Sequence, residues 1–247
     1  MKFKSILVGI MVIAIMSACT SQKEESAEKI DSQISIEPLV EDVLSQEELA
    51  KLTPEDVINS LMEGNKRFVN NDLTARDHTK QVRQSTFGQY PKAVILSCLD
   101  SRIPVEDVFD KGIGDVFVGR VAGNFVNTDL LGSMEFGCKV VGSKIIMVLG
   151  HESCGAIKAT IDKVELGNIT SMLKNINPAV DMSQSYTGQK SSVNPEYVSL
   201  VSENNVKNTI EVIRQNSEIL KEMERKGEIK IVGAIYDMNS GIVRVVN

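Results

Sequence analysis

The chain has 247 residues, of which 42% are hydrophobic and 24% are charged, and its formal net charge is −6. This length and composition predict one globular domain of roughly 200 residues with appendages, and they exclude a chain that is disordered throughout. The acidic balance, without any long basic run, argues against nucleic acid as a partner.

The first 18 residues have the pattern of an export signal. Two lysines precede an apolar run over residues 6–16, which is too short to span a bilayer. The following Met16-Ser17-Ala18-Cys19 resembles the bacterial lipoprotein box, in which the cysteine becomes the lipidated first residue of the mature chain. We therefore expect a signal peptide over residues 1–18 and an extracytoplasmic lipoprotein anchored to a membrane through Cys19. Its place would be the periplasm, the outer membrane or the cell surface, and a plain secretory signal or an uncleaved anchor is the alternative.

A polar segment separates this leader from the folded part of the chain. Residues 19–47 are rich in Ser, Glu, Gln and Lys and carry only isolated Ile and Leu. Such a segment lacks the apolar surface needed to fold alone, so we expect a flexible tether there. The remaining residues, 48–247, are predicted to form the catalytic domain.

The first predicted helix of this domain runs from Thr53 to about Asn70. Thr53 suits the N-cap position, Pro54 suits the first helical position, and acidic residues follow in the first turn. Gly64 lies inside this helix, where glycine costs about 1 kcal/mol relative to alanine. Its presence hints at close packing against a neighbouring element.

Strands and helices then alternate along the chain. Strands are predicted over residues 93–98, 115–119 and 144–149, with a short helix opened by Pro104 and a longer one capped by Asp129. Helices are also predicted over 154–165, 196–214 and from Ser217, while 168–194 is uncertain, and a hairpin of strands 229–236 and 242–246 follows. This order predicts an α/β fold whose mainly parallel central sheet, about four parallel strands plus an antiparallel edge strand, is covered by helices.

Two polar clusters follow the first and third of these strands. They are Cys98-Leu99-Asp100-Ser101-Arg102 and His151-Glu152-Ser153-Cys154-Gly155. Neighbouring parallel strands would bring both clusters to the same carboxyl edge of the sheet. Two thiolates, an imidazole and a carboxylate form the ligand set of a tetrahedral zinc ion. The sequence therefore predicts a zinc enzyme, and a purely structural zinc site is the alternative.

Arg102 decides between an open and a closed zinc site. If it forms a bidentate pair with Asp100, the carboxylate is held off the metal and the fourth position is free for water, whose pKa zinc lowers to about 7. If Asp100 binds zinc instead, the site is capped and inactive. Cys154 would lie at the start of a helix, where the helix dipole favours a thiolate.

These clusters, together with Gly114-Asp115-Val116-Phe117-Val118 and Arg120-Val121-Ala122-Gly123-Asn124, resemble the β-class carbonic anhydrases. The resemblance extends from about Thr53 to the C-terminus. It implies a Zn²⁺ ion on Cys98, His151 and Cys154, with Asp100 as fourth ligand in a closed state, and a catalytic Asp100–Arg102 dyad. It also implies reversible hydration of CO2 to bicarbonate and a proton by attack of zinc-bound hydroxide. A homodimer is implied as the minimal unit, often assembled further, with active sites at the subunit interface.

The same resemblance assigns four substrate-binding positions. Gln89, nine residues before Cys98, has the spacing of the family's substrate-binding glutamine in the plant-like subclass. Phe117 and Ala122 match apolar pocket positions, and Phe136 stands where the family usually has tyrosine. Two other functions stay open: a hydrolase of carbon disulfide or carbonyl sulfide on the same scaffold, and a catalytically silent zinc protein used for binding or sensing.

Overall fold

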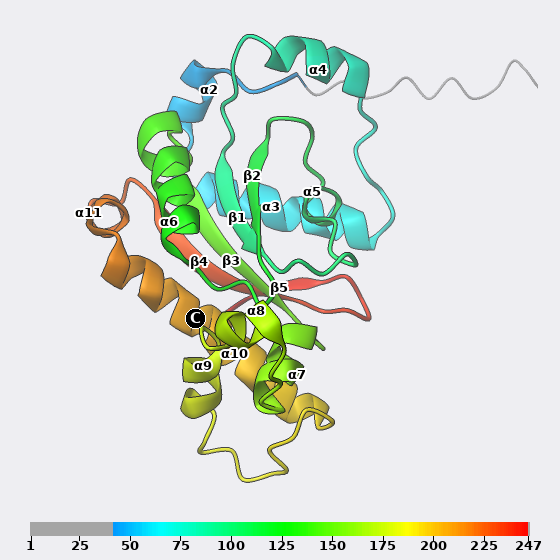
Figure 1. Ribbon diagram of the computed structural model, residues 1–247. Helices are drawn as coiled ribbons and strands as arrows, with labels where there is room; N and C mark the ends of the chain where they lie inside the picture. The colour runs from blue at the N-terminus through cyan, green and yellow to red at the C-terminus, as the bar shows by residue number, and fades with distance from the viewer. Residues whose placement is uncertain (1–41, 247) are drawn as a thin grey trace, which may run out of the picture. The chain divides into compact units, whose positions relative to one another are not determined.

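The computed structural model describes residues 42–246, which are built around one five-stranded sheet of order β2-β1-β3-β4-β5 (Figure 1). Neighbouring strands are parallel except for β4 and β5, which pair antiparallel. The predicted α/β fold is confirmed, including its antiparallel edge strand. The strands are β1 (Ala93–Ser97), β2 (Val116–Arg120), β3 (Ile145–His151), β4 (Lys230–Tyr236) and β5 (Val243–Val246).

Helices cover both faces of this sheet. One face packs on α3 (Pro54–Val69) and α5 (Val105–Val108). The other face packs on α6 (Thr128–Glu135), the π-helix η1 (Phe136–Val141), α10 (Pro195–Asn216) and α11 (Glu218–Arg225). A third apolar cluster joins α10 to α7 (Gly155–Ile161), α8 (Gly167–Leu173) and α9 (Asn177–Met182). The remaining helices are α2 (Gln46–Lys51) and α4 (His78–Ser85).

Every residue of the central strands β1 and β3 is buried. Alternate side chains of a strand point to opposite faces, so these continuous apolar runs supply both cores at once. Val94 and Leu96 enter the core under α10, whereas Ala93 and Ile95 enter the core under α3. The ends of β1 and β3 are thereby held rigidly side by side, which matters for the residues that follow them.

Helix α3 begins as the sequence predicts. Thr53 accepts a hydrogen bond from the backbone of Asp56, whose carboxylate in turn accepts from the Thr53 backbone, which completes a capping box. At Gly64 a Cβ atom would lie 1.8 Å from the carbonyl oxygen of Phe109. The close packing that Gly64 indicated is therefore confirmed.

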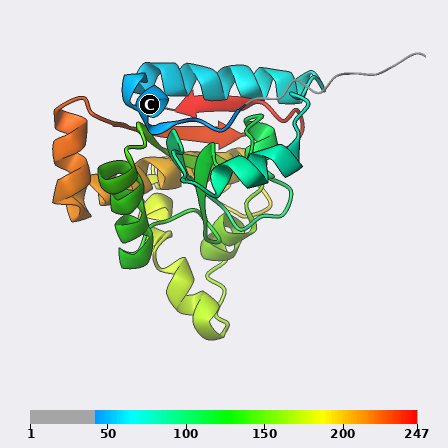
Figure 2. The ribbon, with the colours of Figure 1, turned by 90° about the horizontal axis from the view of Figure 1, so that it is seen from above.

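Helix α3 also joins the C-terminal hairpin, beside which it lies in Figure 2. The Asn65 amide donates to the carbonyl oxygens of Val108 and Gly241, and its oxygen accepts from the backbone N–H of Val243. One buried side chain thus connects α3 to α5 and to the start of β5.

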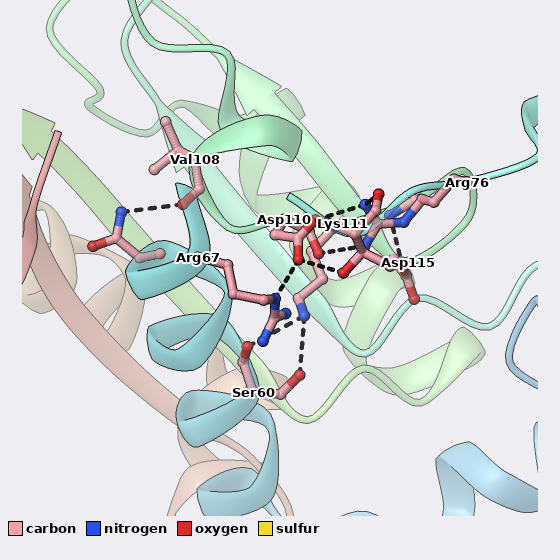
Figure 3. A network of polar contacts seen from close by, with 10 residues as sticks. Ser60, Arg67, Arg76, Val108, Asp110, Lys111 and Asp115 are labelled. Carbon is pink, nitrogen blue, oxygen red and sulfur yellow. Dashed lines mark hydrogen bonds and ion pairs between the residues drawn. The ribbon is translucent and has the colours of Figure 1, made fainter. Parts of the chain in front are cut away.

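A buried carboxylate connects α3 to the segment that precedes α4 (Figure 3). Asp110 accepts hydrogen bonds from the side chains of Arg67, Thr74 and Arg76, the last at 2.6 Å. Burial works to raise the pKa of Asp110, but the hydrogen bonds from Thr74, Arg76 and Arg67 outweigh it and hold the pKa well below its usual range. Asp110 therefore stays ionised at neutral pH.

Several local expectations are wrong in detail. Asn127, not Asp129, caps α6, and the helix continues as a π-helix to Val141. The helix expected over 154–165 ends at Ile161, and the segment left uncertain folds into α8 and α9. Pro104 lies at the N-cap of α5 rather than inside it.

The predicted leader, Cys19 and the tether up to residue 41 lie outside the described residues. Within residues 42–246, no helix has the length and apolar character needed to cross a bilayer.

Candidate metal centre

Three buried side chains meet at the carboxyl edge of the sheet. Cys98 directly follows β1, His151 is the last residue of β3, and Cys154 is the N-cap of α7. Their ligand atoms all lie within 4.8 Å of one another. The two sulfurs are 3.9 Å apart, close to the ~3.8 Å that two Zn–S bonds of about 2.3 Å subtend at a tetrahedral angle. The predicted convergence of both sequence clusters is confirmed.

One ring nitrogen of His151 faces this cluster and has no hydrogen-bond partner among the described residues. Its Nδ1 lies 2.9 Å from the carbonyl oxygen of Glu152, to which it donates. That contact fixes the tautomer in which Nε2 is an acceptor. Among the described residues no group bonds to the buried Nε2. A buried acceptor facing two sulfurs fits a metal ligand, because the ion would supply the missing partner.

The two sulfurs differ in their attraction for a proton. The pKa of Cys98 is lowered, chiefly because Cys154 donates a hydrogen bond to its sulfur; the backbone N–H groups of Gly123 and Asp100 also favour the thiolate, and together these contacts outweigh burial. The pKa of Cys154 is raised by its hydrogen bond to Cys98, by burial and by the Cys98 charge. The helix end acts as expected, since backbone N–H groups of α7 lower this pKa, but they are outweighed. Both sulfurs can be thiolates together only when a cation lies between them.

Asp100 pairs with Arg102 rather than joining the three ligands. The two oxygens of Asp100 accept from Arg102 Nε at 2.9 Å and Nη2 at 2.7 Å, and the Arg102 backbone donates to Oδ1 at 3.0 Å. These hydrogen bonds hold the pKa of Asp100 well below its usual range. Asp100 Oδ2 lies 3.9 Å from His151 Nε2. This bidentate pair is the arrangement expected for an open site, because it holds the carboxylate away from the metal.

Two residues whose roles the sequence pattern did not indicate position Cys98. Arg120, the last residue of β2, donates to the carbonyl oxygen of Cys98 at 2.9 Å. The backbone N–H of Gly123 donates to the Cys98 sulfur, with N and Sγ 3.3 Å apart. Both residues belong to the segment 120–124 noted in the sequence, but the role of a backbone amide leaves no signal in residue identity.

The predicted substrate-binding residues do not all gather around the three ligands. Phe117 and Phe136 line a cavity of about 620 Å³ between β2 and α6, and none of the three ligands lines it. Ala122 lies in the loop beside Gly123 and is half-buried. Gln89 is exposed and precedes the amino end of β1, whereas Cys98 follows the carboxyl end. Within one chain the length of β1, roughly 16 Å, separates them.

Comparisons with known proteins agree with this centre. The carbonic anhydrase family model matches residues 93–243. The chain is 31% identical over 191 residues to carbonic anhydrase 2 of Mycobacterium tuberculosis, covering 74% of this chain and 87% of that protein. It is 32% identical over 192 residues to the carbonic anhydrase of Mycolicibacterium smegmatis, covering 75% and 90%. A tetrameric β-carbonic anhydrase of Sordaria macrospora superposes with a TM-score of 0.60 at 20% identity, covering 78% of this chain and 95% of that one.

Proposed function

This chain belongs to the β-class carbonic anhydrase family, whose members are zinc enzymes, and on that premise we propose that it hydrates CO2 reversibly to bicarbonate and a proton. The observation that carries the proposal is the orphaned, buried Nε2 of His151 beside the sulfurs of Cys98 and Cys154. When bound there, zinc supplies a Lewis acid that makes hydroxide available near neutral pH.

Asp100 and Arg102 would control what occupies the fourth coordination position of the ion. Arg102 donates to both oxygens of Asp100, so the carboxylate is fixed and remains ionised. An ionised carboxylate can accept a hydrogen bond but does not carry a proton away at neutral pH. We assign Asp100 Oδ2 the role of acceptor for the attacking water or hydroxide, and Arg102 the role of keeping that carboxylate off the ion.

A second copy of the chain would complete the site. Gln89 faces solvent at the amino edge of the sheet, and Phe136, half exposed, lines a cavity away from the ligands. If all these residues bind substrate, they must do so against the Cys98 cluster of another subunit. The Sordaria macrospora relative is described as tetrameric, which supports a homodimer or a larger homo-oligomer here.

We propose separately that a lipid on Cys19 anchors the chain to a membrane. It rests on Met16-Ser17-Ala18-Cys19 after an apolar run. Lipidation at Cys19 would place the enzyme on a membrane outside the cytoplasm. A Cys19→Ser chain should move from the membrane to the soluble fraction of a bacterial host, and an unchanged distribution would contradict the anchor.

The substrate is tested by one comparison on the same zinc-loaded sample. Stopped-flow CO2 hydration, measured across pH, is expected to exceed hydrolysis of carbon disulfide and carbonyl sulfide at equal concentrations. Faster turnover of either sulfur compound would identify that compound, and not CO2, as the substrate. Zinc binding with no turnover of any of the three at pH 8 would instead identify a silent binding or sensing protein.

A further inference from the structure

Three polar side chains of α10 are buried among apolar ones: Ser202, which bonds to its own helix, and Asn205 and Thr209, which do not. Asn205 and Thr209 are one helical turn apart and each is 1% exposed. Val201, Val206 and Ile210 are buried on the same stretch of the helix. Buried polar groups are costly unless they have partners, so these two side chains must bond to something across the face.

Their partners lie in the loop that follows β2. The amide nitrogen of Asn205 donates to the carbonyl oxygen of Gly123 at 2.8 Å, and the Thr209 hydroxyl donates to the carbonyl oxygen of Asn124 at 3.3 Å. Gly123 has a φ of +85° and Asn124 a φ of +39°, so both hold a left-handed conformation. The contacts from α10 therefore fix a part of the loop that its own backbone preferences would not fix.

Gly123 transmits this restraint to the metal centre. Its backbone N–H donates to the Cys98 sulfur at 3.3 Å in a buried environment. An N–H···S hydrogen bond withdraws electron density from a thiolate and so weakens its donation to a metal ion, which is how outer contacts tune metal sites. A Cβ atom on Gly123 would lie 2.4 Å from the Ile176 side chain, so substitution at Gly123 itself would disturb packing.

Packing alone does not favour asparagine over an apolar residue at position 205. Its Oδ1 bonds to no group among residues 42–246, and an unpaired buried acceptor is unfavourable. An apolar residue of the same size would avoid that cost. The contact that its Nδ2 makes with Gly123 is therefore the feature that distinguishes asparagine from leucine at this position.

We propose that Asn205 is a positioning residue of the metal centre. By holding the Gly123 carbonyl it directs the Gly123 amide at Cys98 and limits the donor strength of that sulfur. The proposal rests on the proposed function only in taking Cys98, His151 and Cys154 as the ligands of the ion.

The test uses the full chain loaded with cobalt(II), whose thiolate-to-metal charge-transfer absorption reports the electron density on sulfur. Asn205→Leu keeps the γ-branched shape and the number of side-chain heavy atoms, and removes the donor. Ser202→Ala is the matched control, since the buried Ser202 hydroxyl donates to Val198 of its own helix. We expect the Asn205→Leu band at longer wavelength than that of the parent, because a sulfur relieved of the Gly123 hydrogen bond is richer in electrons. The band of Ser202→Ala should match that of the parent.

An unshifted band in fully loaded Asn205→Leu would overturn the proposal, as would an equal shift in Ser202→Ala. If Asn205→Leu does not fold, Asn205→Ala is judged by the same band and the same criterion. A parent chain that binds cobalt but does not hydrate CO2 overturns the proposed function alone, and the band still decides the role of Asn205. A parent chain that binds no cobalt overturns both.

Discussion

Two ligands of the metal centre, His151 and Cys98, are held by contacts from outside the ligand set. The Glu152 carbonyl fixes the His151 ring, and the Gly123 amide and the Arg120 guanidinium hold the sulfur and the carbonyl of Cys98. Such contacts fix ligand geometry before an ion binds. At this scale the chemistry depends on side-chain identity at the ligands and on backbone geometry around them.

Removing the Arg102 side chain should separate the pair that keeps Asp100 away from the ion. We expect Arg102→Ala to bind zinc normally but to hydrate CO2 about 10–100-fold more slowly, because a released carboxylate can occupy the fourth position. Stopped-flow hydration with zinc measured on the same sample checks this. Arg225→Ala, which breaks a similar bidentate pair with Glu222 on α11, is the control and should keep parental activity. Parental activity in Arg102→Ala would refute the pairing role.

Residue types alone predicted the three ligands and the Asp100–Arg102 pair, because thiol, imidazole, carboxylate and guanidinium groups carry their chemistry in their identity. They did not predict Asn205. Its signal was present as a polar residue on the apolar face of a periodic helix. Its partner is a backbone carbonyl that the sequence does not reveal.

At the scale of elements, the close packing of α3 against the backbone of Phe109 depends on Gly64. In Gly64→Ala the new methyl group would meet the backbone of Phe109, which cannot move as a side chain can. We expect unfolding free energy to fall by about 3 kcal/mol, as overpacking does, although alanine is the better helix former. Urea unfolding measures this. Asn59→Ala, at an exposed position of the same helix, should leave stability unchanged or slightly higher, and equal stability of Gly64→Ala would contradict the packing.

The Asp110 network should stabilise the protein in a pH-dependent way. The folded-state pKa of Asp110 lies below its usual value of 3.8, so its stabilisation is complete above that value and is lost as pH falls through the folded pKa. Asp110→Asn should cost about 3 kcal/mol at pH 7, because Arg76 loses its buried partner. Urea unfolding of both proteins should show the difference shrinking below pH 4. A difference that is constant with pH would exclude the charge as its source.

Elements with local signals were predicted well, and those set by tertiary packing were not. The capping box at Thr53 and the short turn between β4 and β5 depend on neighbouring residues only. The π-helical continuation of α6 and the fold of α8 and α9 depend on contacts with distant segments. Asp129 was predicted to cap α6, but Asn127 holds that position; both residue types suit an N-cap, and only the backbone decides between them.

At the scale of the whole molecule, the residues assigned to one site lie at opposite edges of one sheet. The parallel order of β1 and β3 brings the metal ligands together at the carboxyl edge. The same order keeps Gln89 at the amino edge. The family resemblance implied active sites at a subunit interface, and the separation of Gln89 from the metal ligands within one chain supports the proposal that two chains share each site.

Mixing two impaired variants tests whether subunits share sites. In a dimer of Gln89→Ala with Cys98→Ser, one site would combine an intact metal cluster with the Gln89 of the other chain. We therefore expect co-refolded variants to regain up to a quarter of parental CO2 hydration at random pairing, while each variant alone stays impaired. Mixtures with no more activity than the sum of the separate variants would place Gln89 in its own chain's site or outside any site.

The central claim is that one zinc ion on Cys98, His151 and Cys154 makes this chain a carbonic anhydrase. Its most direct measurement is stopped-flow CO2 hydration with metal quantified on the same purified sample, for the parent and for His151→Ala. We expect one zinc per chain in the parent, activity that disappears with chelation and returns with zinc, and neither full zinc content nor activity in His151→Ala. A folded parent without stoichiometric metal, or hydration that persists after the metal is removed, would contradict the account.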